Sequence, residues 1–378
     1  MTFTALAVPE DLITALGRQQ ITIPTAIQTA AIPLLREGRN AYLHAETGTG
    51  KTLAYLLPVF DGLDLSLAAT QAVIVAPTHE LAIQIQRQCT DLAQHAGRAA
   101  RILLLIGGTA LDRQLDKLKK KPHLVVGSPG RIRELVEMRK LKLQQLRYLI
   151  VDEADRLLGV DGLPDIRALI GAAPPTRQLV FVSATEDAAL TATVSALAPS
   201  LAMVKTGAVA VNENIEHFYV VCDERDKPDM VRRIFHALLP ERAMVFVHRN
   251  DTAAQVAALL ERQTVPVADL SGTLNKLDRK QAMDGFRSGA VRVLLASDVA
   301  ARGLDIKGVT HIINLDVPTQ SRDYLHRVGR TGRAGARGVA ITLMAEGDTR
   351  LVRRYEEELG IRLQQVRVRD GQVYVVGE

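Results

Sequence analysis

The sequence contains no tryptophan, and aromatic residues make up only 4% of its 378 residues. Proteins that stack nucleic-acid bases on an aromatic platform depend on such side chains. If this protein binds a nucleic acid, we therefore expect contacts to the backbone. Its net charge of +5, from 47 basic and 42 acidic residues, permits a polyanionic partner without demonstrating one.

Cysteine and long apolar runs are also scarce. Cys89 and Cys222 are the only cysteines, and their separation suits neither a disulfide framework nor a four-ligand zinc site. The longest uncharged stretch, residues 188–204, is too polar for a bilayer helix. The first residues show no basic region followed by an apolar stretch, so no export signal is expected. These observations favour a cytoplasmic, reducing location.

Short apolar runs alternate with helical stretches along the chain. They are residues 72–76, 101–106, 123–126, 148–151, 178–182, 243–247, 291–295 and 309–314. Continuous apolar runs between helices are typical of parallel sheets covered on both faces. With 47% hydrophobic residues and this length, we expect an α/β fold with two such domains. A stretch without helical period predicts residues 1–205 as the first domain, 206–213 as a linker and 214–378 as the second domain.

Residues 45–52, Ala-Glu-Thr-Gly-Thr-Gly-Lys-Thr, follow one apolar run and precede a helical one. Strand, glycine-rich loop, Lys-Thr and helix together are typical of a phosphate loop, although Ala45 departs from its Gly-first form. An ordinary glycine-rich turn without a ligand is the alternative. We expect the whole loop to hold a nucleotide through Ala45, Glu46, Thr47, Gly48, Thr49, Gly50, Lys51 and Thr52. Lys51 is expected to neutralise the terminal phosphates, and the Thr52 hydroxyl to bind Mg²⁺.

The apolar run 148–151 leads directly into Asp152-Glu-Ala-Asp155. Acids at the end of a buried strand downstream of a phosphate loop are hard to explain as solvated surface. We expect Asp152 to hold Mg²⁺ and Glu153 to orient or deprotonate the attacking water. The sequence thus predicts an ATPase.

With these motifs, the chain resembles the DEAD-box RNA helicases, whose name comes from the motif at residues 152–155. Other motifs of the family occur in its order: 77–82, 107–108, 128–131, 183–185, 297–305 and 326–333. The resemblance spans nearly the whole chain. It implies two RecA-like domains, with ATP and RNA bound in the cleft between them.

The resemblance also assigns nucleotide-binding and coupling roles. Gln28 matches the adenine-reading glutamine, and Phe3 stands at the spacing of its aromatic partner. Asp305 corresponds to a ribose contact. Because the second half has no phosphate loop of its own, Arg330 and Arg333 are expected to serve as arginine fingers on the γ-phosphate. Residues expected to couple the domains are Ser183, Thr185, His326 and Arg327.

For RNA, the resemblance implies contacts to phosphate and 2′-OH groups that read little sequence. The corresponding residues are Thr78, Gly108, Ser128, Gly130, Arg131, Arg249, Gly272 and Ser297. The alternative for each is a turn residue chosen for backbone geometry. The sequence departs from the family pattern at Gln20, Ile21, His79, Ser128 and Lys276. His79, in place of an arginine, introduces a titratable group at an RNA contact.

The expected activity is RNA-stimulated hydrolysis of ATP with local unwinding or remodelling of RNA duplexes or ribonucleoproteins. Two alternatives remain: a related DNA helicase, and an ATP-gated RNA clamp or assembly factor with little unwinding. The intact Glu153, Arg330 and Arg333 argue against an inert clamp. Since no additional RNA-recognition module is apparent, substrate choice is expected to come from the core surface or from protein partners.

Overall fold

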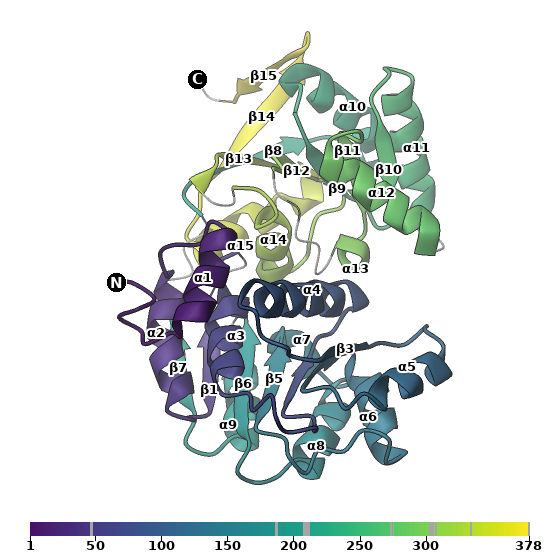
Figure 1. Ribbon diagram of the computed structural model, residues 1–378. Coiled ribbons are helices and arrows are strands. Elements are labelled where there is room, and N and C mark those ends of the chain that lie inside the picture. The colour runs from purple at the N-terminus through teal and green to yellow at the C-terminus, as the bar shows by residue number, and fades with distance from the viewer. Residues whose placement is uncertain are drawn as a thin grey trace. The chain divides into compact units, whose positions relative to one another are not determined.

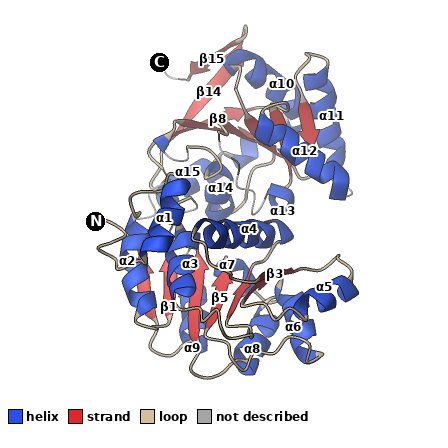
Figure 2. Cartoon of the chain, in the orientation of Figure 1, coloured by secondary structure: helices blue, strands red, loops and turns tan. Residues whose placement is uncertain are grey.

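The computed structural model describes residues 1–45, 48–185, 188–206, 212–272, 274, 276–301, 306, 308–332 and 335–376. It divides into two compact units, Met1–Gly207 and Ala208–Glu378, called unit 1 and unit 2 below. Each unit contains one sheet flanked by helices (Figure 1; Figure 2). Residues 207–211 of the expected linker lie outside the described residues, and the stated domain bounds stay a prediction.

The described part of unit 1 contains a seven-stranded sheet in the order β3-β4-β2-β5-β6-β1-β7. Every neighbouring pair is parallel. The strands are β1 (Ala41–His44), β2 (Ala72–Val75), β3 (Ile102–Leu105), β4 (Leu124–Gly127), β5 (Tyr148–Asp152), β6 (Gln178–Ser183) and β7 (Ala202–Lys205). The carboxyl ends of all these strands therefore meet at one edge of the sheet.

Helices cover both faces of this sheet. They are α1 (Glu10–Arg18), α2 (Ala26–Arg36), α3 (Lys51–Asp61), α4 (His79–His95), α5 (Leu111–Leu118), α6 (Pro129–Glu137), α7 (Ala154–Leu157), α8 (Leu163–Ala172) and α9 (Ala188–Leu197). Successive residues of a strand point to opposite faces. In β2, Ile74 packs with α1 to α4, whereas Val73 and Val75 pack with α6 to α9. This double burial explains why the strand sequences are continuously apolar.

Unit 2 repeats this plan. Its strands are β8 (Ile215–Val221), β9 (Ala243–Phe246), β10 (Val267–Asp269), β11 (Val293–Ala296), β12 (His311–Asn314), β13 (Gly338–Met344), β14 (Leu363–Arg369) and β15 (Gln372–Val375). Their order is β10-β11-β9-β12-β13-β8-β14-β15, and only the β14–β15 pair is antiparallel among the described pairs. Counting from β8, the first six strands have the same order as the first six of unit 1.

The helices of unit 2 again form two layers. They are α10 (Lys227–Leu238), α11 (Asn250–Glu261), α12 (Lys276–Ser288), α13 (Asp298–Ala301), α14 (Ser321–Val328) and α15 (Arg350–Leu359), with short 3₁₀ helices at Glu224–Asp226 and Glu346–Asp348. Helices α10 and α11 pack on one face, and α12 to α15 pack on the other. The expectation of two parallel-sheet domains in an α/β fold is confirmed. The terminal β14–β15 hairpin was not predicted from the sequence.

None of the helices in the described part of the chain combines the length and apolar character that a bilayer crossing requires.

Candidate nucleotide and RNA sites

The phosphate loop connects β1 to α3 at the carboxyl edge of the unit 1 sheet. Gly48 has φ 85° and Gly50 has φ 89°, a left-handed conformation that residues with a Cβ rarely adopt. A Cβ at Gly50 would lie 2.4 Å from Nε2 of Gln28, so only glycine fits there. Gly50 also caps the N-terminus of α3. The backbone N–H groups of that first helical turn suit a phosphate.

Gln28 links the N-terminal region to this loop. Its Nε2 donates to the Gly50 carbonyl at 3.1 Å, and its Oε1 accepts from the Thr25 backbone N–H at 3.0 Å. The expected adenine-reading glutamine therefore lies against the phosphate loop. Phe3 is 2% exposed and packs in the core of unit 1. The adenine contacts of both residues stay a prediction.

Lys51, the first residue of α3, donates from its ammonium group to the Ala45 carbonyl. One turn further along the helix, the buried Tyr55 hydroxyl donates to Oδ2 of Asp152 at 2.8 Å. Thr52 shares a side-chain hydrogen bond with the same tyrosine. Tyr55 thus contacts the aspartate that ends β5, and Thr52 contacts Tyr55.

Asp152 is almost fully buried. Burial raises the pKa of its carboxyl to about 6, against the opposing effects of the Tyr55 hydrogen bond and the Lys51 charge. A nearby cation would favour the ionised carboxylate. A positive ion bound near Asp152 would therefore stabilise its ionised carboxylate.

The donors at this place fit Mg²⁺. A threonine hydroxyl and an aspartate carboxylate are hard oxygen ligands, and Mg²⁺ usually takes only one or two carboxylates together with substrate phosphates and water. Within the described ranges, no group of three or more His, Cys, Asp or Glu side chains forms a self-sufficient metal site. Thr52 and Asp152 are accordingly suited to an ion that arrives with the nucleotide.

Glu153 lies next to this aspartate in a strained backbone conformation, with φ 50° and ψ 53°. Non-glycine residues in the left-handed region cluster at functional sites. Its N–H donates to Oδ1 of Asp152 at 2.9 Å, and its side chain accepts from Arg156 at 3.3 Å. The turn therefore places the Asp152 carboxylate beside Tyr55 and the Glu153 carboxylate beside Arg156.

The turn after β6 is tied to the same motif. The Thr185 hydroxyl donates to Oδ2 of Asp155 at 2.8 Å, and the Ser183 hydroxyl donates to the Thr185 carbonyl at 2.6 Å. Tyr42 of β1 also donates to that carbonyl, at 3.1 Å. A shift of either turn would thus be transmitted to the other. Thr185 thus contacts the DEAD motif directly and Ser183 contacts Thr185, while the predicted coupling of Ser183 and Thr185 to unit 2 stays a prediction.

The strand order separates the two groups of predicted residues in unit 1. The nucleotide residues follow β1 and β5, which lie in one half of the sheet. The RNA residues follow the β3, β4 and β2 strands of the other half and are Thr78, Gly108, Ser128, Gly130 and Arg131. Both groups therefore share one edge without overlapping.

Local structure accounts for several of these RNA candidates. The Thr78 hydroxyl caps α4 by accepting from the Leu81 N–H at 3.2 Å, and Gly108 has φ 67° with open space beside it. Arg131 pairs with Glu134 at 3.0 Å. Its second guanidinium nitrogen, NH1, is buried and has no hydrogen-bond partner among the described residues.

In unit 2, the RNA candidates follow β9, β10 and β11, the strands equivalent to β2, β3 and β4. Arg249 is largely exposed and pairs with Asp251 through two hydrogen bonds of 3.1 and 2.6 Å. The Ser297 hydroxyl accepts from the Ala300 N–H at 3.3 Å, and Gly272 lies near Asn250. The equivalent halves of both sheets thus carry the predicted RNA residues.

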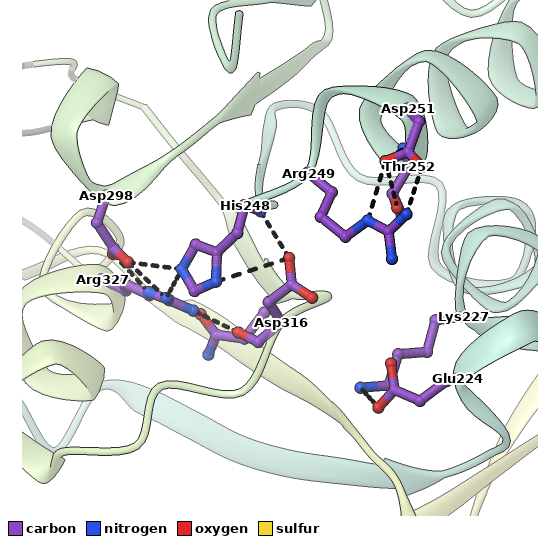
Figure 3. Close-up of polar contacts among 10 residues, drawn as sticks. Glu224, Lys227, His248, Arg249, Asp251, Thr252, Asp298, Asp316 and Arg327 are labelled. Atoms are coloured by element: carbon purple, nitrogen blue, oxygen red, sulfur yellow. Dashed lines mark hydrogen bonds and ion pairs between the residues drawn. The ribbon is translucent and has the colours of Figure 1, made fainter.

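Arg327 is not on the surface of unit 2. Its side chain is 2% exposed, and it forms two 2.7 Å hydrogen bonds with the Asp298 carboxylate. It also donates to the Asp316 carbonyl at 2.6 Å and approaches Nε2 of His248 at 3.1 Å (Figure 3). These contacts were not predicted from the sequence. The coupling role predicted for Arg327 stays a prediction.

His326 and Arg330, the neighbouring predicted residues, are half-buried. The Arg330 N–H donates to the Arg327 carbonyl at 3.1 Å, so a backbone hydrogen bond joins the two residues. The remaining predicted site residues, Glu46, Thr47, Asp305 and Arg333, lie outside the described residues.

A different lysine begins α10, the helix that follows the first strand of unit 2. Lys227 is buried, and its ammonium lies 2.6 Å from the Glu224 carboxylate (Figure 3). Its place is equivalent to that of Lys51, which begins the helix after β1.

Sequence reasoning missed Tyr55, His248, Asp298 and Asp316. The helical spacing of Tyr55, three residues after Thr52, was a usable signal because such residues share one helix face. The other three follow the ends of β9, β11 and β12, where side chains from parallel strands converge. Their position at strand ends was visible in the sequence, but their mutual contacts depend on the strand order.

A parallel sheet with a phosphate loop beside a buried aspartate and an adjacent glutamate defines a nucleotide-hydrolysing protein. The family model of DEAD/DEAH box helicases matches residues 25–193, and that of the helicase conserved C-terminal domain matches residues 226–335. The DEAD-box ATP-dependent RNA helicase CshC of Bacillus cereus is 37% identical over 337 residues, 89% of this chain and 86% of the relative. CshA of Geobacillus kaustophilus is 36% identical over 91% of this chain and 73% of its own length. The chain belongs to the DEAD-box ATP-dependent RNA helicases.

Solved structures agree with this assignment. Dbp5 of S. cerevisiae, bound to RNA and ADP BeF3, matches with a TM-score of 0.86 and 26% identity, covering 98% of this chain and 96% of its own. Mss116p, bound to ssRNA and AMP-PNP, has a TM-score of 0.85 at 23% identity, covering 97% of this chain and 79% of its own. The second likeness concerns the fold alone.

Proposed function

We propose that unit 1 binds ATP and Mg²⁺ at the carboxyl edge of its sheet. The observation that carries this proposal is the hydrogen bond from Tyr55 to the buried Asp152, which holds the helix after the phosphate loop against the aspartate that ends β5. Lys51 would neutralise the terminal phosphates once they replace the Ala45 carbonyl as its partner. Thr52 and Asp152 would hold the Mg²⁺ ion, which supplies positive charge to the phosphates during hydrolysis.

For hydrolysis, we assign Glu153 to the attacking water. Its backbone holds the carboxylate beside Asp152 but separately from it, which suits a group that orients water or accepts a proton. Arg330 and Arg333 would act as arginine fingers, adding positive charge at the γ-phosphate in the transition state. Gln28 would recognise adenine, supported by its hydrogen bond to the phosphate loop; Phe3 and Asp305 would contact the base and the ribose.

We further assign RNA to the other half of each sheet edge. The candidates offer hydroxyls, backbone N–H groups and guanidinium donors, which suit phosphate and 2′-OH groups rather than base edges. The exposed guanidinium of Arg249 supports this assignment. Contacts of this kind predict little sequence preference, so protein partners would supply specificity. A cytoplasmic location also stays a prediction.

The activity would be local opening of RNA duplexes, driven by ATP binding and ended by hydrolysis and release. Thr185, through its hydrogen bond to Asp155, would transmit changes at the nucleotide to the rest of the molecule, with Ser183, His326 and Arg327 as further members of the coupling.

Steady-state ATP hydrolysis tests this function. The purified chain would be assayed alone, with single-stranded RNA, and with single-stranded DNA of the same sequence. We expect strong stimulation by RNA and little by DNA. Equal stimulation by DNA would favour a DNA helicase. Stimulation without duplex unwinding would favour an ATP-gated clamp, and no stimulation by either would contradict the proposal.

A further inference from the structure

Arg327 lies in a cluster of residues at the carboxyl edge of the unit 2 sheet, which includes Asp298, His248 and Asp316 (Figure 3). The guanidinium donates to both carboxylate oxygens of Asp298, to the Asn314 side chain at 3.3 Å and to the Asp316 carbonyl. Its central carbon lies 5.0 Å from the centre of the Phe246 ring. The Phe246 ring therefore covers one face of the Arg327 guanidinium, and hydrogen bonds hold its edges. Two of these hydrogen bonds go to the carboxylate of Asp298.

His248 contacts the same carboxylate. Its Nε2 lies 3.0 Å from Oδ2 of Asp298 and 3.1 Å from NH2 of Arg327. The two contacts require opposite states of this nitrogen, since a protonated Nε2 can donate to Asp298 but only an unprotonated one can accept from Arg327. In the unprotonated state, the lone pair of Nε2 faces a carboxylate oxygen at 3.0 Å. An imidazolium always donates from Nε2 to Asp298, whereas the neutral ring does so only when its hydrogen is on Nε2, and the added positive charge lies between the carboxylates of Asp298 and Asp316.

The surrounding charges favour the protonated state. Asp298 on α13, Asp316 after β12 and Arg327 on α14 face the imidazole, and the Arg249–Asp251 pair lies at the start of its own helix, α11. An imidazolium balances the two carboxylates and the guanidinium to zero net charge. The hydrogen bond to Asp298 raises the pKa of His248 above its ordinary value, against burial and the Arg327 charge.

The cluster also lies between the two sets of residues that the proposed function employs in unit 2. His248 immediately precedes Arg249, and Asp298 immediately follows Ser297, both RNA candidates. On the other side, the Arg327 carbonyl accepts from the Arg330 N–H. Asp298 thus adjoins the RNA candidate Ser297 in the chain. It also holds Arg327, which lies three residues before the proposed arginine finger Arg330.

We propose that His248 is a positioning residue that connects RNA binding to the arginine finger: when protonated, it fixes Asp298 and, through it, Arg327 and the backbone of Arg330. The proposal rests on the proposed function. RNA binding and protonation of His248 then favour the same arrangement, so each strengthens the other.

The test is the RNA concentration that half-saturates ATP hydrolysis, measured between pH 6 and pH 8.5 for the wild-type chain and for His248→Gln. In the wild type, this concentration should rise roughly threefold to tenfold as the pH passes through the pKa of the histidine. Glutamine can donate to Asp298 without titrating, so its profile should be flat and close to the low-pH wild-type value. His248→Ala should show weak RNA response at every pH. His236→Gln, a change at an exposed histidine of α10, is the matched control and should follow the wild type.

A second readout does not depend on the variants. The imidazole pKa of His248 in the wild-type chain, measured by NMR, should rise when single-stranded RNA and the non-hydrolysable ATP analogue AMP-PNP are added. Titration of Asp152 should change the turnover rate equally in the wild type and in the His248 variants. The effect of His248 is therefore read from the half-saturating RNA concentration and not from the turnover rate. His79→Gln tests the other histidine: loss of the pH dependence in that variant, with persistence in His248→Gln, would overturn the inference.

Other outcomes are equally distinct. A flat wild-type profile with strong RNA stimulation would overturn the inference and leave the proposed function standing. An imidazole pKa of His248 that RNA leaves unchanged would also overturn it. Absence of RNA stimulation at every pH would overturn the proposed function itself, together with the inference that rests on it.

Discussion

The Tyr55 hydroxyl donates a 2.8 Å hydrogen bond to Oδ2 of Asp152, although the two residues are 97 positions apart in the chain. Both groups are buried, so neither has water as a substitute partner. The bond also opposes the rise in the Asp152 pKa that burial causes. Tyr55 therefore helps to keep the carboxylate ionised for a cation.

We expect Tyr55→Phe to weaken Mg²⁺-dependent ATP hydrolysis at neutral pH. Loss of a hydrogen bond to a charged group costs about 1.5–3 kcal/mol, so kcat/KM should fall roughly tenfold or more. Because the Asp152 pKa would rise further above 6, the defect should be larger at pH 6.5 than at pH 8.5. The pH profile of kcat/KM checks this. Tyr374→Phe, at an exposed tyrosine of β15, should match the wild type; a Tyr55→Phe profile that also matches it would contradict the assignment.

Lys51→Ala should abolish tight ATP binding, because the side chain is the only one of the phosphate loop that carries a positive charge. Binding of a fluorescent ATP analogue measures the loss directly. Lys140→Ala, at an exposed lysine, is the control. Retention of wild-type ATP affinity in Lys51→Ala would exclude the loop as the phosphate site.

Glu153→Gln should retain ATP and RNA binding but slow hydrolysis by about 10²–10⁴-fold, the usual contribution of a general base. Single-turnover hydrolysis separates this step from product release. Normal hydrolysis in this variant would remove Glu153 from the mechanism.

Arg330→Ala should leave ATP affinity largely unchanged and reduce turnover by about 10³-fold or more, the scale of an arginine finger. Equilibrium ATP binding and steady-state turnover would be measured on the same full-length chain. Arg225→Ala, at an exposed arginine of the first 3₁₀ helix of unit 2, serves as the control. An unchanged turnover rate in Arg330→Ala would contradict the arginine-finger assignment.

Unit 2 should lose stability as the pH falls from about 6.5 towards 4. Burial lowers the pKa values of His217 and His311 to about 4 each. Between these values and the ordinary pKa near 6.5, the unfolded chain binds more protons than the folded chain, so acidification favours unfolding. Each histidine should contribute about 1–3 kcal/mol, allowing for partial solvent screening.

Urea unfolding followed by circular dichroism at pH 7 and pH 4.5 measures this loss. His217→Gln should show a smaller pH dependence of the unfolding midpoint than the wild type, because one titrating group has been removed. His236→Gln, on the exposed side of α10, should not change the dependence. An equal pH dependence in the wild type and His217→Gln would contradict the prediction.

Much of the fold could be predicted because its strands are buried on both faces. The apolar run at 72–76 became β2, and the run at 148–151 became β5, extended by Asp152. In contrast, β14 mixes buried and exposed side chains, β15 at the edge of the sheet alternates exposed and half-buried ones, and β10 is only three residues long. Weak burial gives a weak sequence pattern, so these strands were missed.

The candidate site divides in the same way. Lys51 and Asp152 could be identified because short motifs record their local chemistry. The hydrogen bond from Tyr55 to Asp152 and the position of His248 beside Asp298 could not, because they depend on which strands are neighbours. Sequence spacing alone does not reveal the strand order. The contacts of Arg327 with Asp298, Asp316 and His248 depend on that order, because these residues follow three different strands.

The Lys227–Glu224 pair marks a difference between the two units at equivalent places in the fold. In unit 2, the lysine that begins the helix after the first strand already has a carboxylate of its own chain as partner. The preceding loop, residues 222–226, carries Asp223, Glu224 and Asp226 in place of glycines. An internal anion thus occupies the role that a phosphate would have in unit 1, and the surplus negative charge would repel a nucleotide. If unit 1 binds ATP as proposed, we expect a stoichiometry of one ATP per chain.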